Sequence, residues 1–435
     1  QQYYDEAIGL YQDILNQHPD RADNDRLLYQ MAKAYELDGR RVESMAILDQ
    51  ITRDYPDSSY QTEVQFRRGE ILFSEGDYPQ AEKAYQRVVQ AGADSPYYQN
   101  SVYMHGWSQF KQSRYRQSLR SFTSVLDTLL AETSEIDQLP SSGRSMTRDT
   151  LRVMSLSFSY LEGPYTINEV YSVLGTREYE HLLYDSLGKL YLEKERFRDS
   201  ADTYLEFVKH FPNSDHAPYF SVQAIDVYDN GGFPSLILPA KEQFVSNYGI
   251  TSQFWAERDE TRRATIKPYL HTYLGELASY YHAQAQELQA AQLKQQKKPP
   301  ADASKLITQA EIQQAWLKAA DWYAGFTRTF PADQATPGKV FLMAECLYEA
   351  DDLPAAIDAF ERAAYDYPGA ENGADAGYAA ILATAEHLET LQGEDRASWH
   401  AHKVFDALRF ADAYPQDERA VPVLASSSEE LLALE

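Results

Sequence analysis

The side chains of this sequence that could bind a metal ion or a cofactor are few and poorly spaced. His400 and His402 lie two positions apart, so a helix would direct them to different sides rather than toward one ion. Residues 226–231, Asp-Val-Tyr-Asp-Asn-Gly, are similar to the start of a calcium loop, but Tyr228 and Ile237 stand where oxygen ligands are required. There is no glycine-rich phosphate loop ending in Lys-Ser or Lys-Thr, and no His-Glu-x-x-His motif. The sequence therefore predicts no metal site and no cofactor.

Nucleophilic chemistry is not indicated either. Cys346 is the single cysteine, so no disulfide can form within the chain. Its apolar neighbours in Leu-Met-Ala-Glu-Cys-Leu (342–347) indicate a small core residue. We recognise no activating partner for any Ser, Cys or Lys. The sequence thus predicts no catalytic residue, and we do not expect an enzyme.

The charge balance narrows the class of partner. The chain has 435 residues, with 40 Lys and Arg against 66 Asp and Glu, which gives a formal net charge of −26. A field of this sign repels phosphate backbones, so we expect no nucleic-acid partner. Two interpretations of the acidity stay open, namely solubility of a long exposed fold and a preference for basic segments of a partner protein.

No apolar run in the sequence reaches the roughly 18 residues that a membrane-spanning helix needs, so we expect no transmembrane segment in this chain. The sequence begins with Gln1 rather than Met, which indicates a piece of a longer protein. A membrane tether outside this piece is therefore possible. Residues 3–18 and 426–434 are expected to be helices whose partner helices have been cut away.

A repeat of 37 residues is the strongest pattern in the sequence. Small residues recur at this step in the first helix, and a glycine or serine recurs seven positions after each of them. Two positions of the second helix also recur, one small and one large and apolar. Self-similarity at such a period indicates stacked supersecondary units. The columns are Ala32, Gly69 and Gly106; Gly39, Gly76 and Ser113; Ala7, Ser44, Ala81 and Ser118; and Tyr11, Leu48, Tyr85 and Phe122.

Each repeat is predicted to consist of two helices. Apolar residues recur at three- and four-residue spacing, as in Tyr78, Ala81, Tyr85 and Val88, and a turn with Gly76 separates the two helices. Proline marks the ends of units. The small residues have a mechanical reason, because two helices cross closely there and a large side chain would hold them apart.

These residues resemble the tetratricopeptide repeat (TPR) family. Residues 69–72, Gly-Glu-Ile-Leu, followed by Tyr-Pro-Gln-Ala-Glu-Lys-Ala-Tyr at 78–85, are close to the family pattern. The resemblance covers residues 3 to about 415 and implies an all-α fold, a right-handed α-α superhelix of about ten helix-turn-helix repeats. It also implies a non-enzymatic scaffold that binds protein or peptide partners. Gln109 departs from the pattern, since an apolar residue is expected there.

Two of the repeats are predicted to be irregular, because Ser118 to Ser200 and Ile237 to Ala319 each span 82 residues. We expect a loop insertion around 131–147 in the first. In the second, we expect a long helix over 281–296 and then a Lys/Pro loop around 293–304. The implied domains are a regular TPR block (1–127), an irregular repeat (128–186), a TPR pair (187–250), a second irregular repeat (251–332) and a C-terminal TPR block (333–435).

A narrower resemblance concerns the linkers between repeats. Tyr-Pro-Asp-Ser-Ser-Tyr at 55–60 and Phe-Pro-Asn-Ser-Asp-His-Ala at 211–217 are similar to linkers of bacterial outer-membrane assembly lipoproteins of the BamD type. This resemblance implies a periplasmic or outer-membrane-associated protein in an envelope assembly or trafficking complex. Two alternatives stay open: an adaptor that delivers substrates to an envelope protease or secretion machine, and a scaffold that assembles with itself.

In this family the first helix of each unit lines a concave groove, which identifies candidate binding residues. They recur at 37 residues in three columns, and a similar set lies near the other end of the chain. These aromatics either bind a peptide or pack between neighbouring first helices. The candidates are Tyr29, Lys33, Glu36, Phe66, Glu70, Phe73, Tyr103, Trp107, Phe110, Phe341, Glu345 and Tyr348.

Overall fold

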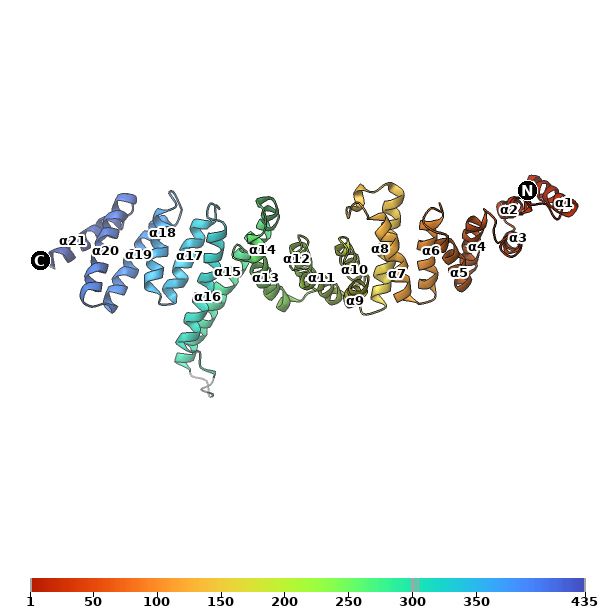
Figure 1. The fold of residues 1–435 in the computed structure, drawn as a ribbon. Coiled ribbons are helices and arrows are strands. Elements are labelled where there is room, and N and C mark those ends of the chain that lie inside the picture. The colour runs from red at the N-terminus through yellow and green to blue at the C-terminus, as the bar shows by residue number, and fades with distance from the viewer. Residues whose placement is uncertain (1, 299–301, 303–304, 434–435) are drawn as a thin grey trace. The chain divides into compact units, whose positions relative to one another are not determined.

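The computed structural model describes residues 2–298, 302 and 305–433. The chain divides into two compact units, residues 1–231 (unit 1) and 232–435 (unit 2). Within the described residues, every regular element is a helix (Figure 1). The all-α prediction is confirmed, and each unit is a row of antiparallel helix pairs in which most helices pack on their sequence neighbours. The boundary between the two units, at Gly231 and Gly232, lies inside the segment 187–250 that was expected to form a TPR pair.

Unit 1 contains five helix pairs, α2/α3, α4/α5, α6/α7, α8/α9 and α10/α11, flanked by α1 and α12. Four of these pairs repeat the 14- to 15-residue helices that the period predicts, whereas α8/α9 is irregular. The bounds are α1 (Gln2–Gln17), α2 (Asn24–Leu37), α3 (Arg41–Asp54), α4 (Gln61–Glu75), α5 (Tyr78–Ala91), α6 (Tyr98–Lys111), α7 (Tyr115–Leu129), the 3₁₀ helix η1 (Ile136–Gln138), α8 (Ser141–Ser159), α9 (Pro164–Leu174), α10 (Glu180–Glu193), α11 (Phe197–His210) and α12 (Ala217–Asn230).

Unit 2 contains the pairs α15/α16, α17/α18 and α19/α20, with α13 and α14 before them and α21 after them. Its bounds are α13 (Pro234–Tyr248), α14 (Gln253–Ala256), α15 (Glu260–Lys297), α16 (Gln309–Thr329), α17 (Thr336–Glu349), α18 (Leu353–Tyr365), α19 (Gly373–Thr390), α20 (Gly393–Ala413) and α21 (Ala420–Ala433).

The column of small residues packs as the period predicts. A Cβ atom on Gly69 would lie 2.6 Å from the Tyr85 ring, and one on Gly106 would lie 2.9 Å from the Phe122 ring. The ring comes in both cases from the second helix of the same pair, sixteen residues later. The serine column adds a polar contact, because Ser44 Oγ donates to the Ala32 carbonyl at 2.9 Å. Aromatic rings thus fill the seam that the missing side chains leave open.

The first insertion is shorter than predicted. We expected a loop over 131–147, but α8 already begins at Ser141, directly after Pro140. The Ser-Ser-Gly sequence at 141–143 indicated a loop. However, Thr147 and Met154 are fully buried on this helix, and such packing outweighs the weak helix propensity of the first turn.

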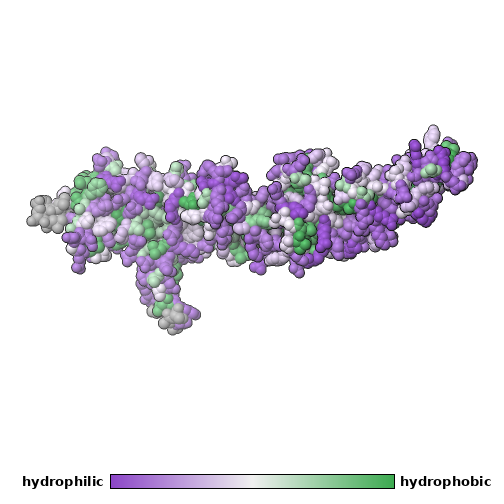
Figure 2. Space-filling view, in the orientation of Figure 1, coloured by the Kyte–Doolittle hydropathy of each residue, from purple (hydrophilic) through white to green (hydrophobic). Residues whose placement is uncertain are grey.

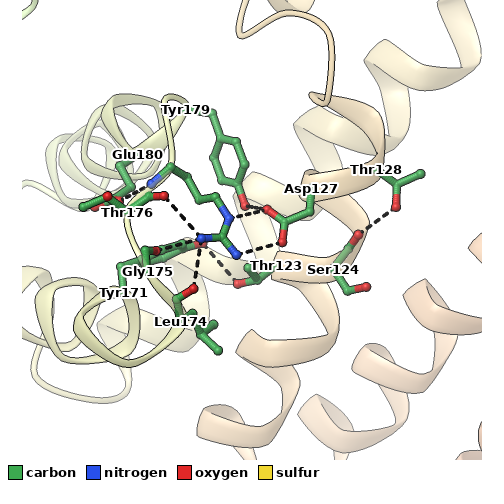
Figure 3. A network of polar contacts seen from close by, with 11 residues as sticks. Thr123, Ser124, Asp127, Thr128, Tyr171, Leu174, Gly175, Thr176, Tyr179 and Glu180 are labelled. Carbon is green, nitrogen blue, oxygen red and sulfur yellow. Dashed lines mark hydrogen bonds and ion pairs between the residues drawn. The ribbon is translucent and has the colours of Figure 1, made fainter.

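A polar network holds the irregular pair to the regular pair before it (Figure 3). The Arg177 guanidinium, in the segment after α9, donates to both carboxylate oxygens of Asp127 on α7, at 2.8 and 3.2 Å. Tyr179 Oη donates to the same carboxylate at 2.6 Å, and Arg177 also donates to the carbonyls of Leu174 and Gly175. The network therefore fixes the position of the segment between α9 and α10, where the irregular pair ends and the next regular pair begins.

The second insertion contains the predicted long helix, which is longer than residues 281–296. The α15 helix runs from Glu260 to Lys297 and pairs with α16, and the two extend together beyond their neighbours (Figure 1). Of the predicted Lys/Pro loop around 293–304, residues 299–301, 303 and 304 lie outside the described residues.

Hydrophilic residues dominate the visible face of both units, as Figure 2 shows. Among the described helices, none combines the length and apolarity needed to cross a membrane. The core consists instead of the seams between helices, as in the cluster formed by α15 to α19 of unit 2.

Candidate functional site

The first candidate column in unit 1 (Tyr29, Phe66 and Tyr103) packs against neighbouring repeats. Tyr29 is only 3% exposed and stacks on Tyr60 at 4.8 Å between ring centroids. Phe66 makes the equivalent stack on Tyr97 at 5.0 Å. Tyr103 donates from its hydroxyl to Asp149 on α8. These residues join successive repeats, and the burial of Tyr29 removes it from a peptide-binding surface.

The second column (Lys33, Glu70 and Trp107) and the third column (Glu36, Phe73 and Phe110) are more accessible. Glu70 is exposed, and Lys33, Phe73, Trp107 and Phe110 are partly exposed. In the α2–α4 part of this face, Arg67 joins Glu36 at 2.8 Å and Glu63 at 3.0 Å. The face therefore alternates rings with charged groups.

An aromatic cluster extends this face at the α6/α7 turn. Phe110 lies 5.4 Å from both Trp107 and Tyr115 between ring centroids, and Tyr115 lies 5.0 Å from Tyr160 at the end of α8. Tyr160 is 54% exposed. Rings held by one another in this way present apolar area at little entropic cost, which suits binding of a partner chain.

In unit 2, the candidate residues Glu345 and Tyr348 line a hollow of about 390 Å³ on the α15–α19 face. Trp316 of α16 and Phe360 of α18 form its apolar floor, and Leu382 of α19 lies on its rim, 51% exposed. The third candidate of this set, Phe341, packs edge-on against Phe360 at 5.8 Å. The structure thus brings two of the three together at one concave site.

The hollow is lined by acidic side chains, and one of its lining residues has a buried hydrogen-bond donor without a partner. Burial, and after it the charge of Glu349, raise the pKa of Glu345. Tyr348 Oη donates to Glu386 at 2.5 Å, and this bond together with burial raises the pKa of Tyr348 to about 12. Trp316 is 3% exposed, and its indole N–H has no acceptor within the described residues. The site therefore lacks a positive group and a carbonyl-type acceptor.

A cysteine–histidine contact borders the hollow, although the sequence did not indicate a partner for Cys346. Its Sγ lies 3.5 Å from Nδ1 of His282 on α15, which is 64 positions away in the sequence. Burial, and then Glu345 and Glu349, raise the pKa of this fully buried thiol to about 12. Burial also lowers the pKa of His282. Both shifts favour the neutral forms of the thiol and the imidazole, whereas a thiolate nucleophile requires the charged thiol.

Gln109, which departs from the repeat pattern, has a polar role that the sequence did not reveal. It donates to Glu82 of α5 at 3.1 Å, and Gln112 donates to the same carboxylate at 2.8 Å. Burial alone would raise the pKa of Glu82, but the hydrogen bonds from Gln112, Gln109 and Arg114 outweigh burial and lower it. Glu82, the second residue of the Ala-Glu-Lys-Ala segment at 81–84, carries no sequence signal for this role.

Comparison with protein families supports the repeat assignment at both ends of the chain. Tetratricopeptide repeat family models match residues 1–62, 60–96 and 340–370. The last match covers most of α17 and α18, which carry Glu345, Tyr348 and Phe360. No curated protein matches the sequence.

Solved structures of tetratricopeptide repeat proteins also match, at low identity. The C-terminal part of a TPR repeat-containing protein from Cytophaga hutchinsonii is 12% identical, with a TM-score of 0.27, and the match covers 72% of this chain and 98% of that chain. A tetratricopeptide repeat protein from Parabacteroides merdae is 13% identical, with a TM-score of 0.29, and the match covers 62% and 100%. The fold assignment rests on the helix pairs and the family models rather than on these likenesses.

Proposed function

We propose that this chain, whose repeats match the tetratricopeptide family over residues 1–96 and 340–370, is a non-catalytic scaffold that binds segments of partner proteins. The hollow of unit 2 is its principal binding site in this proposal. Its occupant is a peptide segment in which a Lys or Arg lies next to an apolar side chain.

The unpartnered indole N–H of Trp316 carries this proposal. A buried donor without an acceptor costs about 1 to 3 kcal/mol, and a peptide carbonyl in the hollow would remove that cost once the Trp316 ring turns its buried N–H toward it. The apolar residue of the peptide would cover Phe360 and Leu382, and its basic group would lie among the carboxylates of Glu345 and Glu349. A partner of this charge is also attracted by the net charge of −26.

A peptide selection tests the hollow directly. Short random peptides displayed on phage are selected against the full chain, and the affinity of the enriched peptides is measured by fluorescence anisotropy. We expect a Lys or Arg beside an aromatic or aliphatic residue in the enriched sequences. Tyr348→Ala and Glu345→Gln should each weaken binding about tenfold, because each removes one contact of a small site.

The matched control is Glu394→Gln, which removes a carboxylate from the exposed start of α20 and should leave the affinity unchanged. Enrichment of acidic peptides, or equal binding by wild type and both hollow variants, would contradict the assignment of this site.

Trp107 tests whether unit 1 adds a second binding surface. Selection is repeated against the Glu345→Lys chain, so that a basic side chain blocks the hollow. We expect Trp107→Ala to weaken binding of these peptides about tenfold while the far-UV circular dichroism stays that of the parent. If the helical signal falls instead, the ring belongs to the core around Phe122, which it contacts at 6.2 Å between centroids.

The cellular setting follows from the linker resemblance alone. We propose a bacterial envelope assembly or trafficking complex, with the protein periplasmic or tethered to the outer membrane, and an adaptor for an envelope protease or secretion machine as the alternative. Cell fractionation of the full-length protein tests the first part, and recovery in the cytosolic fraction would overturn it. Crosslinking in intact cells distinguishes an assembly component from a protease as the partner.

A further inference from the structure

Three metal-ligating side chains converge in unit 2, away from the hollow. His402 Nε2 on α20 lies 2.6 Å from Oε1 of Glu361 on α18 and 3.3 Å from Oδ2 of Asp406, one turn further along α20. One ligand atom from each of the three side chains lies within 4.8 Å of the others. Ligands about 2.0 to 2.2 Å from a tetrahedral ion are separated by roughly 3.3 to 3.6 Å. The 3.3 Å separation of His402 and Asp406 already fits this range, whereas the 2.6 Å contact between Glu361 and His402 has to open.

Asp406 is the unusual member of this group. Its side chain is fully buried, and neither carboxylate oxygen accepts a hydrogen bond within the described residues. A carboxylate without donors is costly to bury, and the His402 imidazole lies 3.3 Å from Oδ2 of this carboxylate. The Tyr365 hydroxyl, whose pKa is raised by burial and by the charge of Asp406, is also buried without a partner. The carboxylate oxygens of the cluster can therefore accept more hydrogen bonds than the neighbouring protein groups donate.

Arg409 is the competing cation. Its guanidinium stacks on the Tyr365 ring at 3.7 Å and approaches Glu361 Oε2 at 3.8 Å. That contact engages the second oxygen of Glu361 and leaves Oε1 directed at His402. The distance is too long for a hydrogen bond, so Arg409 offsets part of the charge without occupying the position between the three ligands.

We propose that Glu361, His402 and Asp406 bind one divalent transition-metal ion that links α18 to α20. One imidazole with two carboxylates suits Zn²⁺ or Mn²⁺ better than Ca²⁺ or Mg²⁺, which take oxygen ligands. The His402–Asp406 spacing of four residues places both ligands on one side of a helix, unlike the His400–His402 spacing that led us to expect no metal site. The sequence did not reveal the third ligand, because Glu361 is 41 positions from His402.

The experiment uses the full, untagged chain after treatment with a chelator. Isothermal titration calorimetry with ZnCl₂, MnCl₂ and CaCl₂ should show one equivalent of Zn²⁺ or Mn²⁺ and weaker or no binding of Ca²⁺. Co²⁺ should give a visible absorption band of a low-coordinate site. Asp406→Asn and Glu361→Gln should each lower the metal affinity about tenfold or more.

Two variants keep the result interpretable. Glu361 is partly exposed, so Glu361→Gln preserves the fold even if the buried Asp406→Asn does not, and circular dichroism checks both. His400→Gln removes a histidine two positions away and should leave the affinity unchanged. The proposal is overturned if wild type binds none of the ions, if Glu361→Gln binds as wild type does, or if His400→Gln abolishes binding.

Discussion

Replacing Gly188 with alanine is expected to destabilise unit 1 by about 2 to 3 kcal/mol, although the change adds a single methyl group. An ideal Cβ at this position would lie 2.4 Å from Cε1 and Cζ of Tyr204 and 2.9 Å from its hydroxyl oxygen. Tyr204 is 1% exposed and stacks on Phe220 at 5.6 Å, so the ring has no space to withdraw. The α10/α11 pair must therefore separate to accept the methyl group.

The control is Gly9→Ala on α1, where an added Cβ meets nothing within 4 Å. Both substitutions raise helix propensity equally, and Gly9→Ala should stabilise the chain by about 0.5 to 1 kcal/mol. Urea unfolding followed by circular dichroism gives both values. Tyr204→Leu should lessen the effect of Gly188→Ala in a double-mutant cycle, because the smaller side chain vacates the position of the ring. Additive effects would show that Tyr204 is not the obstacle.

This close approach could be predicted from the sequence, because it depends only on the repeat. Gly188 lies 82 residues after Gly106, the same step as from Ser118 to Ser200, and an aromatic residue follows it sixteen positions later, as it does after Gly69 and Gly106. A seam between two helices of one pair is a local contact, and local periodicity specifies it. Periodicity likewise predicted the helix pairs. The apolar neighbours of Cys346 predicted its burial, and the Ala/Gln-rich stretch at 281–296 predicted the long helix of the second irregular repeat.

Contacts between residues far apart in sequence could not be predicted. The hollow in unit 2 is formed by helices from α15 to α19, and only Glu345 and Tyr348 of its lining stood out by periodicity. Tyr29 shares its 37-residue column with Phe66 and Tyr103, which are partly exposed, yet a partner ring at Tyr60 buries Tyr29. Spacing identifies a helix face, whereas the neighbouring repeat decides whether that face is covered.

Acidification is expected to destabilise unit 1 through one pair of histidines. His181 on α10 stacks on His216, just before α12, at 3.8 Å between ring centroids and 8° between planes. Burial, and then the neighbouring His216, lower the pKa of His181 to about 4. Its Nδ1 lies 2.9 Å from the Glu178 carbonyl, a contact that is too weak to restore the usual value. A protonated pair would place two positive rings in contact.

The direction of the pH effect follows from that lowered pKa. The unfolded chain takes up a proton on His181 near pH 6.5, whereas the folded chain does so only near pH 4. Between these two pH values the unfolded state binds more protons than the folded state. The contribution of His181 to the free energy of unfolding therefore decreases as the pH falls, by roughly 3 kcal/mol in total, and does not change further below about pH 4. His181→Phe keeps a ring on His216 but cannot titrate, so urea unfolding from pH 7 to pH 4 should show a smaller loss than in wild type. His18→Gln, at an exposed histidine, should lose as much stability as wild type, since the carboxylates titrate in all three chains. Equal losses in wild type and His181→Phe would show that His181 keeps an ordinary pKa in the folded chain.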